Sequence, residues 1–174
     1  MPLSPMMKHY LSVKDEYPDC IIFYRLGDFY EMFFDDAKRA SEILELVLTG
    51  RDCGLEQKAP MCGVPFHAAD SYIAKLVAAG EKVAICEQLE DPATAKGMVA
   101  RGVVRVVSAG TMTDDSALSE KNNTYIALLY AGENTAALSY ADITTGDFYA
   151  IQREGDNALS AVLEELVILS PAEV

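Results

Sequence analysis

The sequence predicts an α/β (α+β) fold in which helices flank a mixed β-sheet. Over residues 1–112, segments with helical spacing alternate with short apolar runs, which is typical of helices packed on a sheet. After a polar stretch the pattern changes to three short strands and one helix. We therefore expect a first domain over 1–112, a linker over 113–123, and the N-terminal part of a second, truncated domain over 124–174.

Local signals support each element of the first domain. Ser4 is a suitable helix N-cap with Pro5 in the first turn, and Asp35 and Asp36 supply the negative charge that a helix N-terminus favours. Prolines bound the strand over 61–65, so we expect it to be brief or near a sheet edge. The predicted elements are a helix over 4–16, strands over 20–26 and 29–33, a helix over 37–47, short strands over 47–52 and 61–65, a helix over 67–79, and strands over 82–89 and 103–107.

The second part of the chain is predicted as a meander followed by a helix. Turn signals at 132–134 and 144–146 separate three extended runs. Apolar residues at helical spacing follow. The predicted strands cover 124–130, 135–143 and 147–152, and the helix covers 157–169.

Composition indicates a soluble globular protein, because 51% of the residues are hydrophobic and 24% are charged. No apolar run has the length of a membrane span, and the start of the chain lacks the features of a secretory signal. The four cysteines show neither a C-x-x-C spacing nor a pair of histidines to complete a zinc site. We expect a cytoplasmic protein with reduced thiols, no metal and no membrane contact.

The net charge of −13 argues against strong nucleic-acid binding by the chain alone. The charge is unevenly distributed, however. Residues 1–110 hold 12 basic and 16 acidic residues, whereas residues 111–174 hold 2 basic and 11 acidic residues. Most of the negative excess therefore belongs to the second part of the chain.

The most informative stretch runs from Phe23 to Phe33, where a Gly-Asp turn signal separates two extended segments. Side chains alternate in an extended segment, so Phe29 and Glu31 point to one face and Tyr30 points to the other. In one interpretation Phe29 belongs to the core and Glu31 lies at a solvated strand edge. In the other, the ring and the carboxylate are displayed together beside the turn for a ligand.

A cluster of carboxylates in the same region offers a further alternative. Asp28, Glu31 and Asp35 could hold a divalent metal in a nuclease-like site. Helix capping already accounts for Asp35 and its neighbour Asp36, which disfavours this metal-dependent interpretation.

Four ordered blocks of sequence resemble the MutS family of DNA mismatch-repair proteins. The Gly27–Glu31 run resembles the family's Phe-x-Glu element. The blocks cover 25–37, 60–67, 72–93 and 101–111, and their number and order make the resemblance specific. It implies a mismatch-recognition domain, followed by part of a connector domain with a ribonuclease-H-like fold.

The resemblance also implies roles for single residues. Phe29 would enter the minor groove and stack on a mispaired base, and Glu31 would hydrogen-bond that base. Arg51 and Arg101 match positions where the family contacts the DNA backbone. Lys58 or Lys96 could add to this binding, whereas Gly102 stands where relatives often carry a basic residue.

The resemblance further implies partners and chemistry for a longer protein. The partners would be mismatched double-stranded DNA, a MutL-type repair protein and a second copy in a homodimer. No G-x-x-x-x-G-K-[ST] loop occurs, so we expect no enzymatic activity and no cofactor in this chain. ATP and magnesium would be bound beyond residue 174. A protein–protein interaction module of a repair complex is the remaining alternative.

Overall fold

The structure is a computed structural model that describes residues 3–90, 97, 99–112 and 124–174. The described chain divides into two compact units, Met1–Ser108 and Ala109–Val174. Each unit is treated by itself below. The predicted linker over 113–123 lies outside the described residues.

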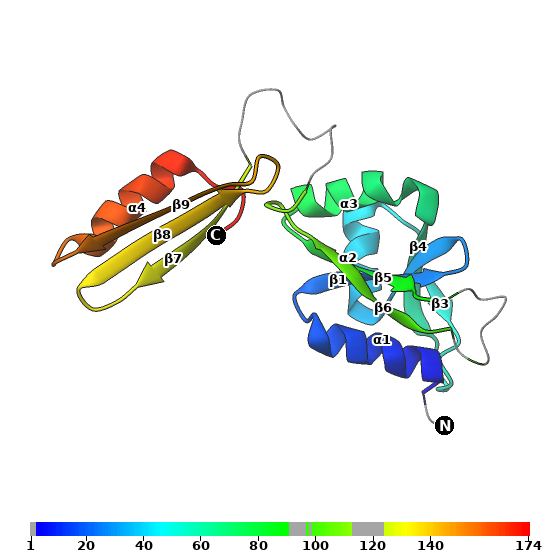
Figure 1. The fold of residues 1–174 in the computed structure, drawn as a ribbon. Coiled ribbons are helices and arrows are strands. Elements are labelled where there is room, and N and C mark those ends of the chain that lie inside the picture. Colours follow the sequence, from blue (N-terminus) through cyan, green and yellow to red (C-terminus); the bar gives the residue numbers. More distant parts are fainter. Residues whose placement is uncertain (1–2, 91–96, 98, 113–123) are drawn as a thin grey trace. The chain divides into compact units, whose positions relative to one another are not determined.

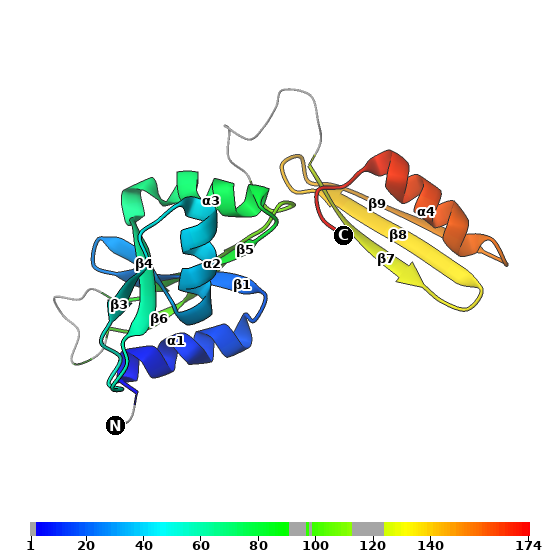
Figure 2. The same ribbon diagram turned by 180° about the vertical axis from the view of Figure 1, so that it is seen from behind.

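The first unit contains a six-stranded sheet with helices on both of its faces (Figures 1 and 2). Ser4 caps the first helix through its side chain, as predicted, and accepts a hydrogen bond from the Met7 amide. The elements are α1 (Pro5–Glu16), β1 (Cys20–Leu26), β2 (Phe29–Phe33), α2 (Phe34–Leu44), β3 (Thr49–Arg51), β4 (Ala59–Pro65), the 3-10 helix η1 (Phe66–Ala68), α3 (Ala69–Ala78), β5 (Lys82–Gln88) and β6 (Arg101–Val107).

The sheet is mixed, with the strand order β3-β4-β2-β1-β5-β6. All neighbours are antiparallel except the central pair β1 and β5, which run parallel and pair Cys20 with Lys82. Helix α1 covers one face, where Tyr10 packs edge-on against Phe33 and Tyr24. Helices α2 and α3 cover the other face (Figures 1 and 2). The predicted mixed sheet flanked by helices is therefore present in this unit.

Strand β4 agrees with the prediction of a strand near a sheet edge, although it is longer than the predicted range 61–65. It spans seven residues and lies inside the sheet, between β3 and β2. Its prolines occupy the second and last positions, so the residues between them keep their N–H groups for the ladder. The strand is therefore near the edge of the sheet, as predicted, with only the three-residue β3 outside it.

Asp36 also has a role that helix capping does not describe. Its side chain is buried, and its Oδ2 accepts hydrogen bonds from the Tyr10 hydroxyl at 2.7 Å and from the Ile22 amide at 3.1 Å. Its Oδ1 lies 2.8 Å from the Lys14 ammonium. One carboxylate at the start of α2 therefore joins that helix to α1 and β1.

The second unit is an antiparallel sheet with one helix on it (Figure 1). Its elements are β7 (Tyr125–Ala131), β8 (Thr135–Asp142), β9 (Asp147–Glu154) and α4 (Ala158–Leu169). Buried Ala136, Leu138 and Val162 belong to the core between α4 and the strands. On the sheet's other face Leu128, Tyr130 and Phe148 are exposed.

No helix in the described part of the chain has the length and hydrophobicity needed to cross a membrane.

Candidate functional site

The hairpin between β1 and β2 ends in a two-residue turn at the rim of the sheet. Leu26 pairs with Phe29, and Gly27 adopts a φ of 58°, a conformation that favours glycine at the first central position of such turns. The Asp28 carbonyl accepts a hydrogen bond from the Phe66 amide at 2.9 Å. The turn is thereby tied to the end of β4, which fixes the start of β2.

Phe29 begins β2 with 47% of its surface exposed. Tyr30, the next residue, is buried, as the alternation along the strand requires. Phe29 is therefore not a core residue. The interpretation that placed its ring in the core was wrong, because the ring lies at the last pair of the hairpin, next to the turn.

Glu31 lies on the same face as Phe29, but it is not at a solvated edge. Its strand is flanked by β1 and β4, and its side chain is only 15% exposed. Arg51 of β3 donates a hydrogen bond to Glu31 Oε2 and forms an ion pair with it. The predicted pair of a ring and a carboxylate on one face is present, and an arginine neutralises the carboxylate.

Arg101 is held by the backbone of its own unit. Its Nε donates to the Arg25 carbonyl at 2.9 Å, and its Nη1 donates to the Val99 carbonyl at 2.8 Å. Its guanidinium carbon lies 5.3 Å from the centroid of the Tyr24 ring. Burial raises the pKa of Tyr24 to about 12. The role of Arg101 toward DNA stays a prediction, while its structural role in joining β6 to β1 is clear.

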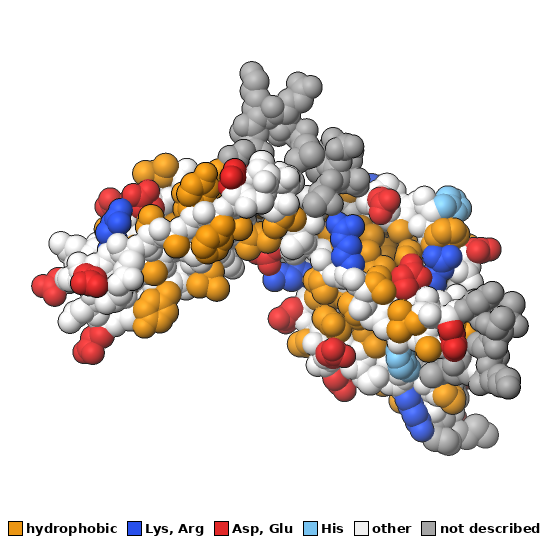
Figure 3. Space-filling model, in the orientation of Figure 1, with side chains coloured by type: hydrophobic (Ala, Val, Ile, Leu, Met, Phe, Trp, Pro, Cys, Tyr) orange, Lys and Arg blue, Asp and Glu red, His pale blue; other side chains and the backbone are white. Residues whose placement is uncertain are grey.

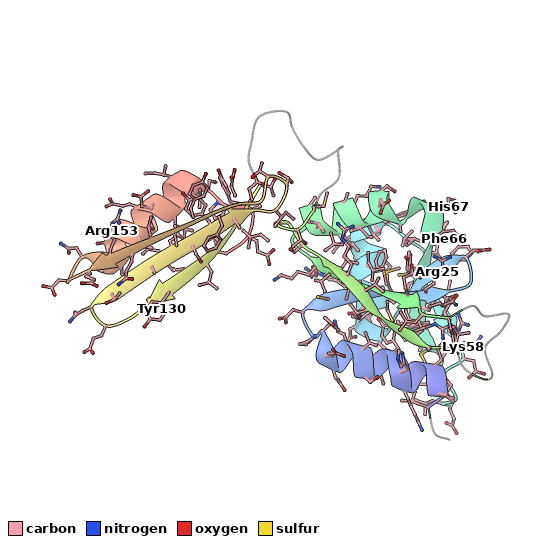
Figure 4. All side chains as sticks on the ribbon, viewed as in Figure 1. Arg25, Lys58, Phe66, His67, Tyr130 and Arg153 are labelled. Atoms are coloured by element: carbon pink, nitrogen blue, oxygen red, sulfur yellow. The ribbon has the colours of Figure 1, made fainter. Side chains whose placement is uncertain are left out.

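The other basic positions differ in their surroundings. Lys58 is exposed just before β4 (Figure 4). A Cβ added at Gly50 would lie 3.0 Å from the Lys58 Cβ. Lys96 lies outside the described residues. At Gly102 an added Cβ would lie 3.1 Å from Cδ1 of Leu89, so a basic side chain there would require Leu89 to move.

A second cluster at this rim was not singled out from the sequence. The Arg25 guanidinium carbon lies 3.7 Å from the centroid of the Phe66 ring, and Phe66 is 41% exposed. The Tyr30 hydroxyl donates to Glu87, and burial raises the pKa of Tyr30 to about 12. Figure 4 shows Arg25, Phe66 and His67 close together, and basic and hydrophobic side chains adjoin on this side of the unit in Figure 3. Phe66 belongs to a block that resembles the MutS family. Its stacking on Arg25 could not be predicted, because it depends on β4, β2 and β1 being neighbours in the sheet.

The carboxylates proposed for a metal-dependent nuclease are not brought together. Glu31 is bound to Arg51, and Asp35 Oδ1 lies 2.8 Å from Lys38 Nζ, which holds the pKa of Asp35 below its usual range. Among the residues that the structure describes, no group of three or more His, Cys, Asp or Glu side chains could hold a metal ion. The geometry gives that alternative no support.

Comparisons with known proteins agree with the architecture of the first unit. Residues 4–116 match the protein family described as MutS domain I. The chain is 57% identical to the DNA mismatch repair protein MutS of Clostridium botulinum (strain 657 / Type Ba4) over 174 residues, which are 100% of this chain and 18% of that relative. It is 58% identical to MutS of Ruminiclostridium cellulolyticum over 172 residues, which are 99% of this chain and 20% of that relative.

The chain belongs to the MutS domain I family. The family match covers the first unit with its mixed sheet and flanking helices, so the predicted membership of the MutS family is confirmed. The chain spans about a fifth of the length of the curated relatives it matches.

Proposed function

We propose that the chain is the mismatch-recognition module of a MutS-type DNA mismatch-repair protein. The observation that carries the proposal is the exposed ring of Phe29, on the same face as Glu31 at the rim of a sheet. The exposed ring offers a stacking surface to a base, and the carboxylate beside it offers a hydrogen-bond acceptor. Membership of the MutS domain I family supports DNA with a mispaired or unpaired base as the ligand.

The physical basis is deformability of the duplex. Phe29 inserts into the minor groove and stacks on one base, which opens a base step at a cost of about a few kcal/mol. This cost is smallest where the base is mispaired or unpaired. Glu31 then hydrogen-bonds the displaced base. The module therefore senses pairing through the ease with which the step opens.

Removing the ring tests this function directly. The assay is fluorescence anisotropy of labelled duplexes carrying a G·T pair, a single-base loop or full pairing. It is run at low salt, where contacts between basic side chains and phosphates are screened least. Stacking of a base on an aromatic side chain contributes about 1–3 kcal/mol. We expect Phe29→Ala to reduce affinity for the mismatched duplexes about 5- to 150-fold and to leave the paired duplex nearly unchanged.

The matched control is Phe148→Ala, which removes a phenyl ring from the second unit that is more exposed than Phe29. Its binding should equal that of the unchanged chain. Equal affinity of the unchanged chain for mismatched and paired duplex would overturn the proposed function. So would an identical loss in both phenylalanine variants.

For the longer protein we propose the activities that accompany such a module. These are repair in the cytoplasm, a homodimer that encloses DNA, an ATPase site with ATP and magnesium beyond residue 174, and recruitment of a MutL-type protein. Residues 124–174 would be the start of a connector domain with a ribonuclease-H-like fold. The antiparallel sheet followed by α4, with a parallel bridge from Ile126 to Glu173, supports this assignment. The present chain would act without enzymatic activity and without a cofactor of its own.

One observation favours a second function for the other unit. The face of the β7–β9 sheet opposite α4 exposes Leu128, Tyr130 and Phe148 at 65%, 56% and 68%. Apolar surface of this kind marks contacts between proteins or domains. The protein–protein interaction alternative is thus proposed for this unit alone, beside DNA recognition by the first.

A further inference from the structure

The contact between Arg51 and Glu31 changes the role that the sequence suggests for Arg51. The two residues lie on β3 and β2, which flank β4 on either side. Arg51 pairs with Ala59 and Glu31 pairs with Gly63, and these two β4 residues share one face of the sheet. Both side chains therefore extend over the same face, and the arginine reaches across β4 to the carboxylate.

Gly63 provides the space for this contact. An added Cβ at this position would lie 3.4 Å from Glu31 Cγ and 3.2 Å from the Tyr30 carbonyl oxygen. A side chain here would crowd the Glu31 stem that lies over β4. Because Gly63 has no side chain, β4 leaves room for the Glu31 side chain beneath the ion pair.

The geometry of the pair leaves one carboxylate oxygen available. Arg51 binds Oε2, and no described residue hydrogen-bonds Oε1. The Glu31 side chain is 15% exposed and the Arg51 side chain is 38% exposed. A fixed carboxylate with one free oxygen can accept a hydrogen bond from a base N–H without losing its arginine partner.

We propose that Arg51 is a positioning residue that acts through Glu31, so that it contributes to the distinction between mismatched and paired DNA. This inference rests on the proposed function. The ion pair with Arg51 holds the Glu31 carboxylate on the Phe29 side of the sheet and cancels the charge of that carboxylate. A lone carboxylate entering a groove lined by phosphates would be repelled, and this repulsion is greatest in the complex where Glu31 is inserted, which is the mismatch complex.

The competing role is a direct contact between Arg51 and a phosphate. Such a contact carries no information about base pairing. It would strengthen binding to every duplex equally and would add about one released counterion to the salt dependence. The two roles therefore predict different results for the same variant.

A double-mutant cycle separates these roles. Affinities of the 174-residue chain for G·T and fully paired duplex are measured for Arg51→Ala, Glu31→Gln and the double variant. We expect Arg51→Ala to lower the ratio of mismatched to paired affinity about fivefold, as for a partly exposed charged pair. In the Glu31→Gln background, where no carboxylate charge remains, the same substitution should change this ratio less than about twofold.

Two further variants complete the test. Arg51→Lys keeps a positive charge within reach of Glu31 and should restore most of the ratio. Lys58→Ala removes a cation that lies beside Gly50, a neighbour of Arg51 in β3. It should weaken binding to both duplexes equally, as the loss of a phosphate contact would. Melting temperatures of all variants show whether each one folds.

The outcomes distinguish failure of the inference from failure of the proposed function. Arg51→Ala could lower the affinity for both duplexes equally, and by the same factor in the Glu31→Gln background. That result would assign Arg51 to a phosphate and overturn the inference alone. A chain that binds neither duplex, or that binds both equally before any substitution, would overturn the proposed function and the inference with it.

Discussion

The carboxylate of Asp36 is predicted to stabilise the first unit more than any exposed ion pair does. Strand β1 pairs with β2 only over Tyr24–Leu26, so the Ile22 amide has no strand partner on that side. Asp36 accepts that N–H at 3.1 Å and the Tyr10 hydroxyl at 2.7 Å. Replacement by alanine removes the single oxygen that accepts both hydrogen bonds in this buried site.

The magnitude follows from what each partner loses. A buried amide without an acceptor costs about 1–3 kcal/mol. Tyr10 keeps a weaker contact with the Phe33 carbonyl at 3.4 Å, and Lys14 keeps the Cys20 carbonyl at 2.6 Å and is 29% exposed. We expect Asp36→Ala to lower the free energy of unfolding by about 3 kcal/mol, of which the partly exposed ion pair contributes at most about 1 kcal/mol.

Thermal unfolding followed by circular dichroism measures this loss. A change of about 3 kcal/mol corresponds to a decrease of roughly 12–24 °C in the Tm of a unit of this size. Asp36→Asn retains an acceptor oxygen and loses only the charge, so its Tm should fall by roughly 4–8 °C. Asp35→Ala is the control, because Asp35 is exposed and its carboxylate bonds the exposed Lys38. A loss in Asp36→Ala no larger than in this control would refute the reasoning.

Two further predictions concern pH. Burial raises the pKa of the Cys62 and Cys86 thiols to about 11, so iodoacetamide at pH 8 should label them only after unfolding. The free energy of unfolding should fall as the pH rises from about 8.5, the unfolded pKa, toward 11. Rapid labelling of these two thiols in the folded chain would contradict this prediction. Hydrogen bonds from the Thr144 side chain and backbone hold the pKa of Asp142 below its usual range. The stabilisation that Asp142 gives the second unit is therefore present above the unfolded pKa of about 4. It is lost as the pH falls through the lower pKa that Asp142 has in the folded state. The Tm of the second unit should show this acid-dependent loss, and Asp142→Asn should remove it, whereas parallel pH profiles for both chains would count against the assignment.

The elements of the first unit could be predicted from local signals because those signals act over a few residues. Ser4 and Pro5 mark the start of α1, and the Gly27–Asp28 pair marks the turn of the hairpin. Alternation along β2 was sufficient to place Phe29 and Glu31 on one face. Each of these inferences uses residues that are neighbours in the chain.

The contacts of the site could not be predicted in the same way, because they depend on strand order. Arg51 meets Glu31 only because β4 lies between their strands, and nothing in the sequence near either residue indicates that order. Arg101 meets the Arg25 carbonyl because β6 and β1 both flank β5. Asp36 looked like a helix-start residue because its partners Tyr10 and Ile22 are distant in sequence.

The parallel pairing at the centre of the sheet has a consequence for synthesis of the protein. The β1 edge that receives β5 joins Cys20 to Lys82, so it stays open until β5 has left the ribosome. Until then a nascent chain presents an apolar strand, Cys20–Leu26, with unsatisfied backbone groups along one side. A nascent chain that pauses before β5 emerges would thus keep this apolar edge open to other chains, and β6 can join the sheet only after β5 is in place.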